Sequence, residues 1–162
     1  MSKTKHVSET PATQWLKRHG VPFVEHVYTY VEHGGTDEVG RQLGLDTRRV
    51  VKTLVMEDDA ARPLIVLMHG HGEVSTKNLA RQIGAKRVVI CRPEVAQRHT
   101  GFQVGGTSPF GTRKSMPVYV ESSIMTSPTI YINGGRRGYI LEVSSDTLTA
   151  LLKAQRVDVA LD

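Results

Sequence analysis

Residues 102–143 read FQVGGTSPFGTRKSMPVYVESSIMTSPTIYINGGRRGYILEV, and this stretch decides the fold class. Runs rich in valine, isoleucine and tyrosine follow one another in it near residues 118–120, 129–133 and 139–143. Such runs, bounded by glycine, proline and serine, are typical of β-strands. Successive strands here, with helices and strands interspersed elsewhere, predict an α+β fold with a mixed sheet rather than a regular doubly wound fold.

The residues before this stretch alternate between helical and strand patterns. Thr10-Pro11 opens the first helix with a hydroxyl cap followed by proline, Thr36 and Ser75 are expected to cap two more helices, and Pro93 begins a fourth. Ser144 or Ser145 is expected to cap the last helix. Strands are expected over residues 22–30, 50–56, 63–68 and 86–91.

The chain of 162 residues has the length of one domain. We expect residues 1–9, which are polar, to form a mobile tail and residues 10–162 to form the domain. The apolar runs are too short for a membrane helix, and no apolar segment follows the charged N-terminus as it would in a secretory signal. Cys91 is the only cysteine, so an intramolecular disulfide is excluded and a reducing cytoplasm is expected.

Positive charge is concentrated in one region. Residues 77–114 contain eight basic residues and one acidic residue, a net charge of +7, whereas the rest of the chain has a net charge of −2. Clustered lysine and arginine favour phosphate-rich partners such as nucleic acids, although a solvated surface of unrelated charges is the alternative.

Lys52 and Thr53 are polar residues in the otherwise apolar run Val50–Met56. A buried ammonium is costly unless it meets an anion or a hydrogen-bond acceptor. Lys52 is therefore a candidate for binding an anionic substrate. Two alternatives are a salt bridge within the protein and a strand-edge position from which the lysine stem reaches water.

Other candidate catalytic features are weaker. Two glycine-rich loops, residues 105–111 and 134–138, offer backbone N–H groups for an oxygen atom, but each also fits a hairpin turn. His69 and His71 have the i, i+2 spacing of metal ligands, yet a turn between strand and helix explains them better. Cys91 ends an apolar strand and is interpreted as a small buried hydrophobe rather than a nucleophile.

Three segments together resemble a known family. They are Lys52-Thr53-Leu54, the segment from Ala96-Gln97-Arg98 through Gly101-Phe102 to residues 105–111, and the segment from Thr129-Ile130-Tyr131 to residues 134–138. Their order and spacing resemble the YbaK family of aminoacyl-tRNA deacylases, which is related to the editing domain of bacterial prolyl-tRNA synthetase. The resemblance extends from about residue 15 to residue 160.

This resemblance implies a free-standing hydrolase that cleaves the ester between a mischarged amino acid and tRNA, in the best-known branch cysteine on proline tRNA. It implies a single α+β domain with a mixed, partly barrel-like sheet flanked by helices, and it implies no metal and no organic cofactor. The aminoacylated 3′ end of tRNA is the expected partner, with prolyl-tRNA synthetase as a possible second one. No membrane association is expected, and the expected state is a monomer or weak homodimer. A non-catalytic domain that binds tRNA or another oligonucleotide is the alternative.

The resemblance also assigns roles to residues. Lys52 matches the essential lysine of the family, and Gly105 and Gly106 match a glycine pair that borders the aminoacyl-adenosine. The other expected substrate-binding residues are Tyr28, Thr53, Ser108, Asn133 and Gly134. The expected tRNA-binding residues, from the basic region, are Lys86, Arg87, Arg113 and Lys114.

Three departures from the family pattern concern the pocket. Asn133 stands where cysteine-specific members typically have serine, and Ile140 replaces an aspartate common in that branch. The pocket phenylalanine of the family has no clear counterpart near residues 34–36. These departures leave the accepted amino acid open, and they affect the expected reaction class less.

Overall fold

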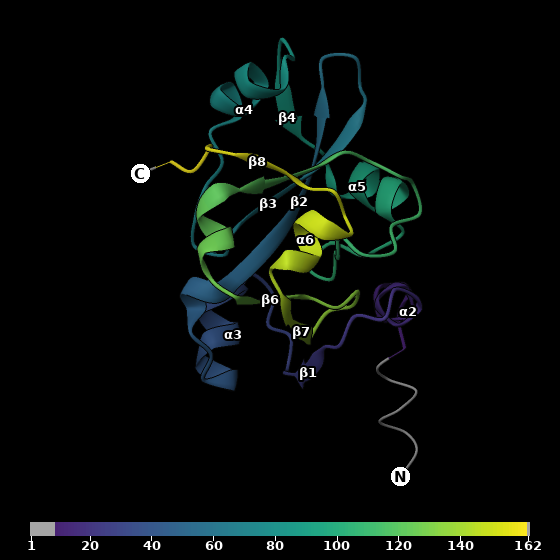
Figure 1. Ribbon diagram of the computed structural model, residues 1–162, viewed down its shortest axis with the longest axis vertical. Helices are drawn as coiled ribbons and strands as arrows, with labels where there is room; N and C mark the ends of the chain where they lie inside the picture. Colours follow the sequence, from purple (N-terminus) through teal and green to yellow (C-terminus); the bar gives the residue numbers. More distant parts are fainter. Residues whose placement is uncertain (1–8, 162) are drawn as a thin grey trace.

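Strand β2 (Val50–Asp58) lies at the centre of the fold, with the other strands arranged on both sides of it (Figure 1). The computed structural model describes residues 9–161, so residues 1–8 of the expected N-terminal tail lie outside the described part. The sheet has eight strands in the order β1-β7-β6-β2-β3-β5-β8, and β4 pairs with β2 beside this path. The other strands are β1 (Val24–Val27), β3 (Pro63–His69), β4 (Val88–Ile90), β5 (Val118–Glu121), β6 (Thr129–Asn133), β7 (Tyr139–Ser144) and β8 (Gln155–Val157).

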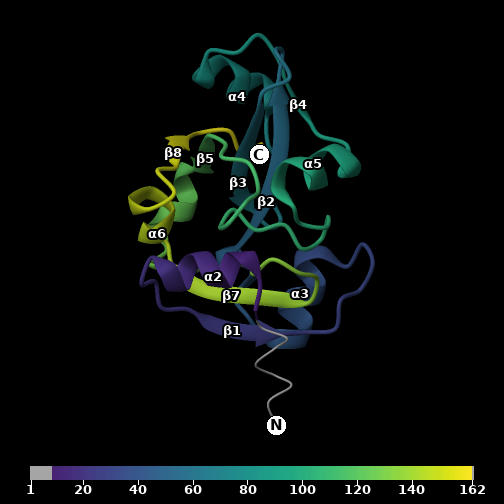
Figure 2. The same ribbon diagram turned by 90° about the vertical axis from the view of Figure 1, so that its right-hand side faces the viewer.

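The sheet is mixed, as the sequence predicts. β2 is antiparallel to β3 and β4 but parallel to β6, and β5 is parallel to both β3 and β8. β7 is antiparallel to β1 and β6. Figure 2 shows β1 and β7 running across the direction of β2, so the sheet curves strongly along its length. This mixed sheet with flanking helices confirms the expected fold class.

The helices begin close to the predicted residues. They are α2 (Pro11–Arg18), α3 (Gly35–Leu43), α4 (Thr76–Ile83), α5 (Pro93–Thr100) and α6 (Asp146–Ala150), with short 3-10 turns η1 (Thr47–Arg49) and η2 (Ser122–Thr126). Thr10 and Ser75 cap α2 and α4 through side-chain oxygens, as expected. The expectation that Thr36 caps a helix is wrong, because α3 already starts at Gly35 with Gly34 as its cap. None of the helices in residues 9–161 has both the length and the apolar character needed to span a membrane.

Alternation along the strands divides the core between the two faces of the sheet. Val51 of β2 and Ile65 and Leu67 of β3 pack with helices α2 and α6 on one face. Met56 of β2 and Val66 of β3 pack under α4 on the other face. A smaller cluster on that second face joins α3 to the strands beside β2, and its buried members are Val39, Val50, Tyr131 and Ile140.

The first strand is shorter than predicted. Residues 22–30 were expected to be extended throughout, whereas β1 ends at Val27. Tyr28 still donates its N–H to Gly138, but the backbone of Thr29 instead bonds the side chain of Gln42 on α3. The chain therefore leaves the sheet at this point, and the local β-propensity of Tyr28 and Tyr30 does not extend the strand.

Candidate functional site

One edge of β2 is left open in the middle of the sheet. On this edge β6 pairs with Val50 and Val51, and β4 pairs with residues 56–58. Cys91, just after β4, adds one hydrogen bond from its N–H to Val55. Residues 52–54 have no strand partner on this edge, which creates an opening in an otherwise continuous sheet.

A cavity of about 780 Å³ lies at this opening. Its walls come from segments far apart in the sequence: the chain after β1, the start of α3, β2, the end of β4 and both glycine-rich loops. Of the expected site residues, the cavity lining includes Tyr28, Lys52, Thr53, Gly105 and Asn133. The fold therefore gathers five of the eight residues expected to contact the aminoacyl end.

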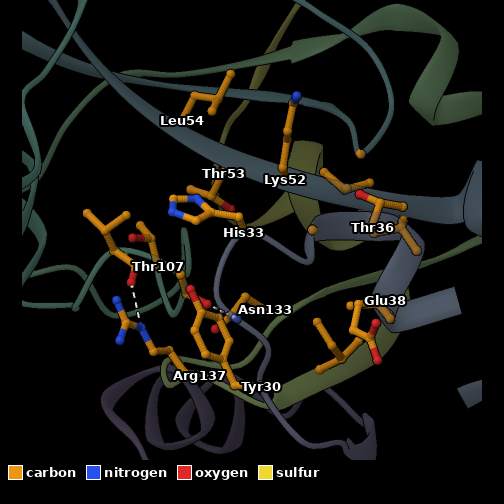
Figure 3. A pocket seen from close by; sticks show the side chains of 18 of the residues that line it. Tyr30, His33, Thr36, Glu38, Lys52, Thr53, Leu54, Thr107, Asn133 and Arg137 are labelled. Carbon is orange, nitrogen blue, oxygen red and sulfur yellow. Dashed lines mark hydrogen bonds between the residues drawn. The ribbon is translucent and has the colours of Figure 1, made fainter. Parts of the chain in front are cut away.

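Lys52 extends from β2 at this opening (Figure 3). Within residues 9–161 its ammonium group makes no ion pair and no hydrogen bond with protein. Burial lowers the pKa of Lys52 below its usual value, and the carboxylate of Glu73 opposes this effect in part. None of the described carboxylates forms an internal salt bridge with Lys52, and the half-buried ammonium is available to an anion entering the cavity.

Thr53 points to the other side of β2, as the alternation of side chains requires (Figure 3). Its hydroxyl is shielded from solvent and has no hydrogen-bond partner among the described residues. Buried hydroxyls normally have a partner. The cavity therefore offers a cation on one side of the strand and an unsatisfied hydroxyl on the other.

Gly105 occupies a tight turn that closes one side of the cavity. The N–H of Gly106 donates to the carbonyl of Gln103 at 2.8 Å, and Gly105 has a φ of +92°, which fits the third position of a type II turn. The carbonyl of Val104 accepts a hydrogen bond from Arg137, so the N–H of the same peptide group points the opposite way. This N–H of Gly105 has no partner among the described residues.

Gly106 has a different role from the one expected. Its N–H is already engaged in the turn and is not free to hold a substrate oxygen. A Cβ atom at Gly106 would lie 2.7–2.8 Å from the backbone of Arg136 and Arg137. Gly106 thus allows the first glycine loop to pack directly against the second, and it is absent from the cavity lining.

Asn133 joins these two loops. Its side-chain nitrogen donates to the carbonyl of Gly105 at 3.1 Å, and its side-chain oxygen accepts the N–H of Gly135 at 2.7 Å (Figure 3). Both ends of the amide are therefore occupied. Asn133 lines the cavity, and its two hydrogen bonds hold the Gly105 turn in position against the second glycine loop.

Aromatic and charged residues that the sequence reading did not single out also line the cavity. The guanidinium carbon of Arg137 lies over the ring of Tyr30, 4.7 Å from the centroid of that ring. Both residues border the Gly105 turn. Thr107 and His33 face the same space (Figure 3). Among these four residues, Arg137 had one feature in the sequence that could have drawn attention to it, namely its position within the second glycine loop. Near them, burial raises the pKa of Tyr28.

Two expected substrate contacts lie outside the cavity lining. Ser108 is fully buried, and its hydroxyl accepts the N–H of Phe110 at 3.1 Å. Gly134 donates its N–H to Tyr139 and packs against the Tyr139 ring. Both residues are engaged in contacts within or beside their own glycine loops.

The expected tRNA-binding residues lie on a different part of the surface. Lys86 and Arg87 line one groove, Lys114 lines another, and Ala85 belongs to both grooves. Arg113 is exposed beside Lys114. Lys77 and Arg81 of α4 add to the first groove. The two grooves meet at Ala85, and their basic residues together with Arg113 are called the basic area below.

The remaining candidates from the sequence separate in space. His69 bonds the hydroxyl of Ser123 while His71 bonds Asp37, and a turn begins at Gly70, as predicted. Cys91 is half-buried at the margin of the cavity. Burial, together with the Glu57 carboxylate, raises the pKa of its thiol to about 11, which argues against a nucleophilic thiolate at neutral pH.

The family model described as "Aminoacyl-tRNA editing domain" matches residues 34–151, which include β2, both glycine loops and most of the cavity. The chain belongs to this family. Membership confirms the resemblance found in the sequence and identifies the protein as an editing hydrolase of the aminoacyl-tRNA deacylase class.

Individual relatives agree with this membership. An Enterococcus faecalis protein named provisionally as a Cys-tRNA(Pro)/Cys-tRNA(Cys) deacylase is 28% identical over 160 residues, with 98% of each chain covered. The proline–tRNA ligase of Limosilactobacillus fermentum is 22% identical over 107 residues, which are 64% of this chain and 19% of the ligase. A crystal structure described provisionally as a trans-editing enzyme for prolyl-tRNA synthetase has the same fold, with a TM-score of 0.81, 21% identity and coverage of 94% of this chain and 96% of that one.

Proposed function

We propose that this protein is a free-standing editing enzyme that hydrolyses the ester between a small, wrongly attached amino acid and the 3′ end of tRNA, with Lys52 as its central site residue. The observation that carries this proposal is the unpaired Lys52 ammonium at the opening of β2. Its desolvation is unfavourable in the free protein and is offset when an anionic substrate binds.

The terminal adenosine of tRNA supplies such an anion. In the proposed complex Lys52 contacts a phosphate or ester oxygen, and the Thr53 hydroxyl on the other side of β2 gains the hydrogen-bond partner it lacks. Tyr28 and Tyr30 provide half-buried aromatic walls for the aminoacyl-adenosine. The substrate thus satisfies both unpaired polar groups of the cavity.

The Gly105 turn is the proposed oxyanion site. The Gly105 N–H has no partner within residues 9–161, and the turn that presents it is held by Asn133 and Arg137. A donor fixed before the substrate arrives stabilises the negative charge that develops on the ester carbonyl oxygen. This assignment replaces Gly106, whose N–H is already used within the turn.

In the proposed reaction, groups on the substrate itself take the place of a side-chain general base. Water adds to the ester carbonyl, and the bond to the ribose oxygen then breaks, which releases the amino acid and leaves a free hydroxyl on tRNA. A substrate hydroxyl of the ribose positions the water, and a cysteine substrate can alternatively attack its ester through its own thiol. Assistance by the substrate is consistent with the protonated state of the Cys91 thiol.

Cysteine on proline tRNA is the first substrate to test. The name of the Enterococcus faecalis relative supports it, as does the similarity to part of a proline–tRNA ligase. Asn133 and Ile140 differ from the cysteine-specific pattern, so alanine, serine and threonine belong in the same test. Action in the cytoplasm, alone or together with prolyl-tRNA synthetase, follows from this proposal.

A deacylation panel tests the proposal. Cysteine, alanine, serine and threonine on proline tRNA, and cysteine on its matched tRNA, are incubated with the parent protein and with Lys52→Met. We expect hydrolysis of at least one mischarged proline tRNA, and we expect Lys52→Met to reduce it by about 100-fold or more, as for the loss of a transition-state contact.

Two results would count against this proposal. Binding of tRNA without hydrolysis of any panel member would favour the non-catalytic binding module. Parental rates in Lys52→Met would remove Lys52 from the site. Lys52→Arg is the matched variant, because it keeps the charge while changing the shape of the cation.

A further inference from the structure

Three potential metal ligands of different chemistry meet beside the cavity. The carboxylate of Glu57, the thiol of Cys91 and the imidazole of His99 each offer one ligand atom, and these atoms all lie within 4.8 Å of one another. Nε2 of His99 lies 3.0 Å from Oε2 of Glu57. The three residues are separated by up to 42 positions in the chain, so their convergence results from the tertiary fold.

Regular structure holds all three residues. Glu57 lies on β2 opposite Val89 of β4, and Cys91 directly follows β4 with its N–H bonded to Val55. His99 lies in the last turn of α5, and its side chain is only 11% exposed. Figure 2 shows α5 beside β2, near the end of β4. The ligand atoms are therefore positioned by two strands and a helix, which suits a site that needs fixed geometry.

The geometry points to a zinc-type site formed by Glu57, Cys91 and His99. Sulfur, nitrogen and carboxylate oxygen are the three donor types that Zn²⁺ binds in proteins. A tetrahedral zinc ion separates its ligand atoms by roughly 3.3–3.6 Å, given bond lengths of about 2.0–2.3 Å. Because these atoms already lie within 4.8 Å of one another, changes of at most about 1.5 Å in their separations would bring them to that spacing. A thiolate and a carboxylate together also balance the charge of a divalent cation.

The site has an entrance and an open coordination position. Cys91 belongs to the cavity wall together with the neighbouring Pro93 and Ala96, so an ion can arrive through the cavity. Three protein ligands leave the fourth tetrahedral position to water or to an oxygen of a molecule in the cavity. Glu57, Cys91 and His99 are distinct from Lys52 and Gly105, so metal binding can be measured separately from the proposed deacylation.

Cobalt binding tests this site, because Co²⁺ takes zinc sites and reports a thiolate ligand by charge-transfer absorption in the near ultraviolet. The parent protein, freed of metal and kept reduced, is titrated with Co²⁺ and then with Zn²⁺. We expect one Co²⁺ per chain with that absorption, and displacement by Zn²⁺, because the filled d shell of Zn²⁺ loses no ligand-field energy in a tetrahedral site. Zn²⁺ should also raise the thermal midpoint, since a ligand that binds only the folded state stabilises it.

The variants separate this site from adventitious binding. Cys91→Ser should remove the charge-transfer band, and His99→Gln should weaken Co²⁺ binding by at least about tenfold. His71→Gln is the matched control, because His71 is an exposed histidine paired with Asp37, and it should bind as the parent does. Circular dichroism of each variant checks that it is folded. The absence of a thiolate band in the parent, or its persistence in Cys91→Ser, would overturn the assignment.

Discussion

At the scale of single residues, Lys52 combines a proposed functional position with a folding penalty. Its pKa is lowered mainly because burial disfavours the charged form. Between this lowered value and the unfolded value of about 10.4, the unfolded chain holds more protons than the folded protein. Stability must therefore rise with pH through that interval. A lysine placed for stability alone would not have its pKa lowered on folding.

Lys52→Met should accordingly abolish deacylation and leave the protein at least as stable as the parent at neutral pH. The variant has no ammonium to desolvate, so its stability advantage should shrink as the pH approaches about 10.4. Thermal midpoints measured at several pH values for both proteins check this expectation. Lys77→Met, at an exposed position on α4, controls for the loss of one positive charge. A large destabilisation by Lys52→Met at neutral pH would contradict it.

At the scale of elements, the packing of one glycine loop on the other sets the position of the Gly105 turn. Gly106 meets the backbone of Arg136 and Arg137, and backbone atoms cannot rotate away as a side-chain end can. Asn133 and Arg137 add hydrogen bonds between the same two loops. The turn and its support therefore form one unit.

Gly106→Ala should push these loops apart. We expect a loss of about 1–3 kcal/mol in folding stability, as for other overpacked sites. A shift of about 1 Å in the Gly105 N–H should also slow single-turnover hydrolysis by on the order of 100-fold. Thermal unfolding and single-turnover rates on the same samples measure the two effects.

Gly72→Ala is the matched control for this substitution. Gly72, like Gly106, has no positive φ, but the atom that its Cβ would first approach is the sulfur of Met68, at 3.1 Å. A flexible methionine can adjust, so this variant should stay close to the parent in both measurements. If Gly106→Ala behaves in the same way, contact between the loops does not control the site.

At the scale of the whole molecule, the proposed function divides the recognition of tRNA between the basic area and the cavity. The two grooves that meet at Ala85 are lined by lysine and arginine side chains, which suits contacts to phosphates. The cavity at the opening of β2 is suited to the aminoacyl end. Affinity and turnover should therefore respond to different substitutions.

Removal of four charges from the basic area tests this division. We expect weaker tRNA binding with a flatter salt dependence, because each lost phosphate contact reduces the log–log slope by roughly 0.7–0.9. Hydrolysis of bound substrate should change little in single-turnover reactions at saturating protein. The four substitutions, all to alanine, are at Lys86, Arg87, Arg113 and Lys114.

A second fourfold variant removes the same amount of charge elsewhere. Its residues are exposed, and three of them form ion pairs with nearby carboxylates, so its tRNA affinity and salt slope should stay closer to those of the parent. Equal slopes for the parent and the first variant would identify the basic area as an ordinary solvated surface. The control residues are Lys17, Arg18, Arg41 and Arg48.

The sequence alone determined the features that depend on near neighbours in the chain. Alternating apolar residues predicted the strands from β2 to β7, and Thr10, Ser75 and Pro93 marked three helix starts, because caps and periodicity act within a few residues. The lysine within Val50–Met56 was also conspicuous without a structure, since an ammonium in an apolar strand calls for a counter-charge.

Only the tertiary structure decided what those features do together. The opening beside Lys52 exists because β6 and β4 pair with opposite ends of the same edge of β2. The N–H proposed to hold a substrate oxygen is that of Gly105 rather than Gly106 because the turn uses the latter. Such contacts join residues far apart in the chain. Local sequence patterns carry no information about them, because strand pairing and loop packing are settled only when the whole core assembles.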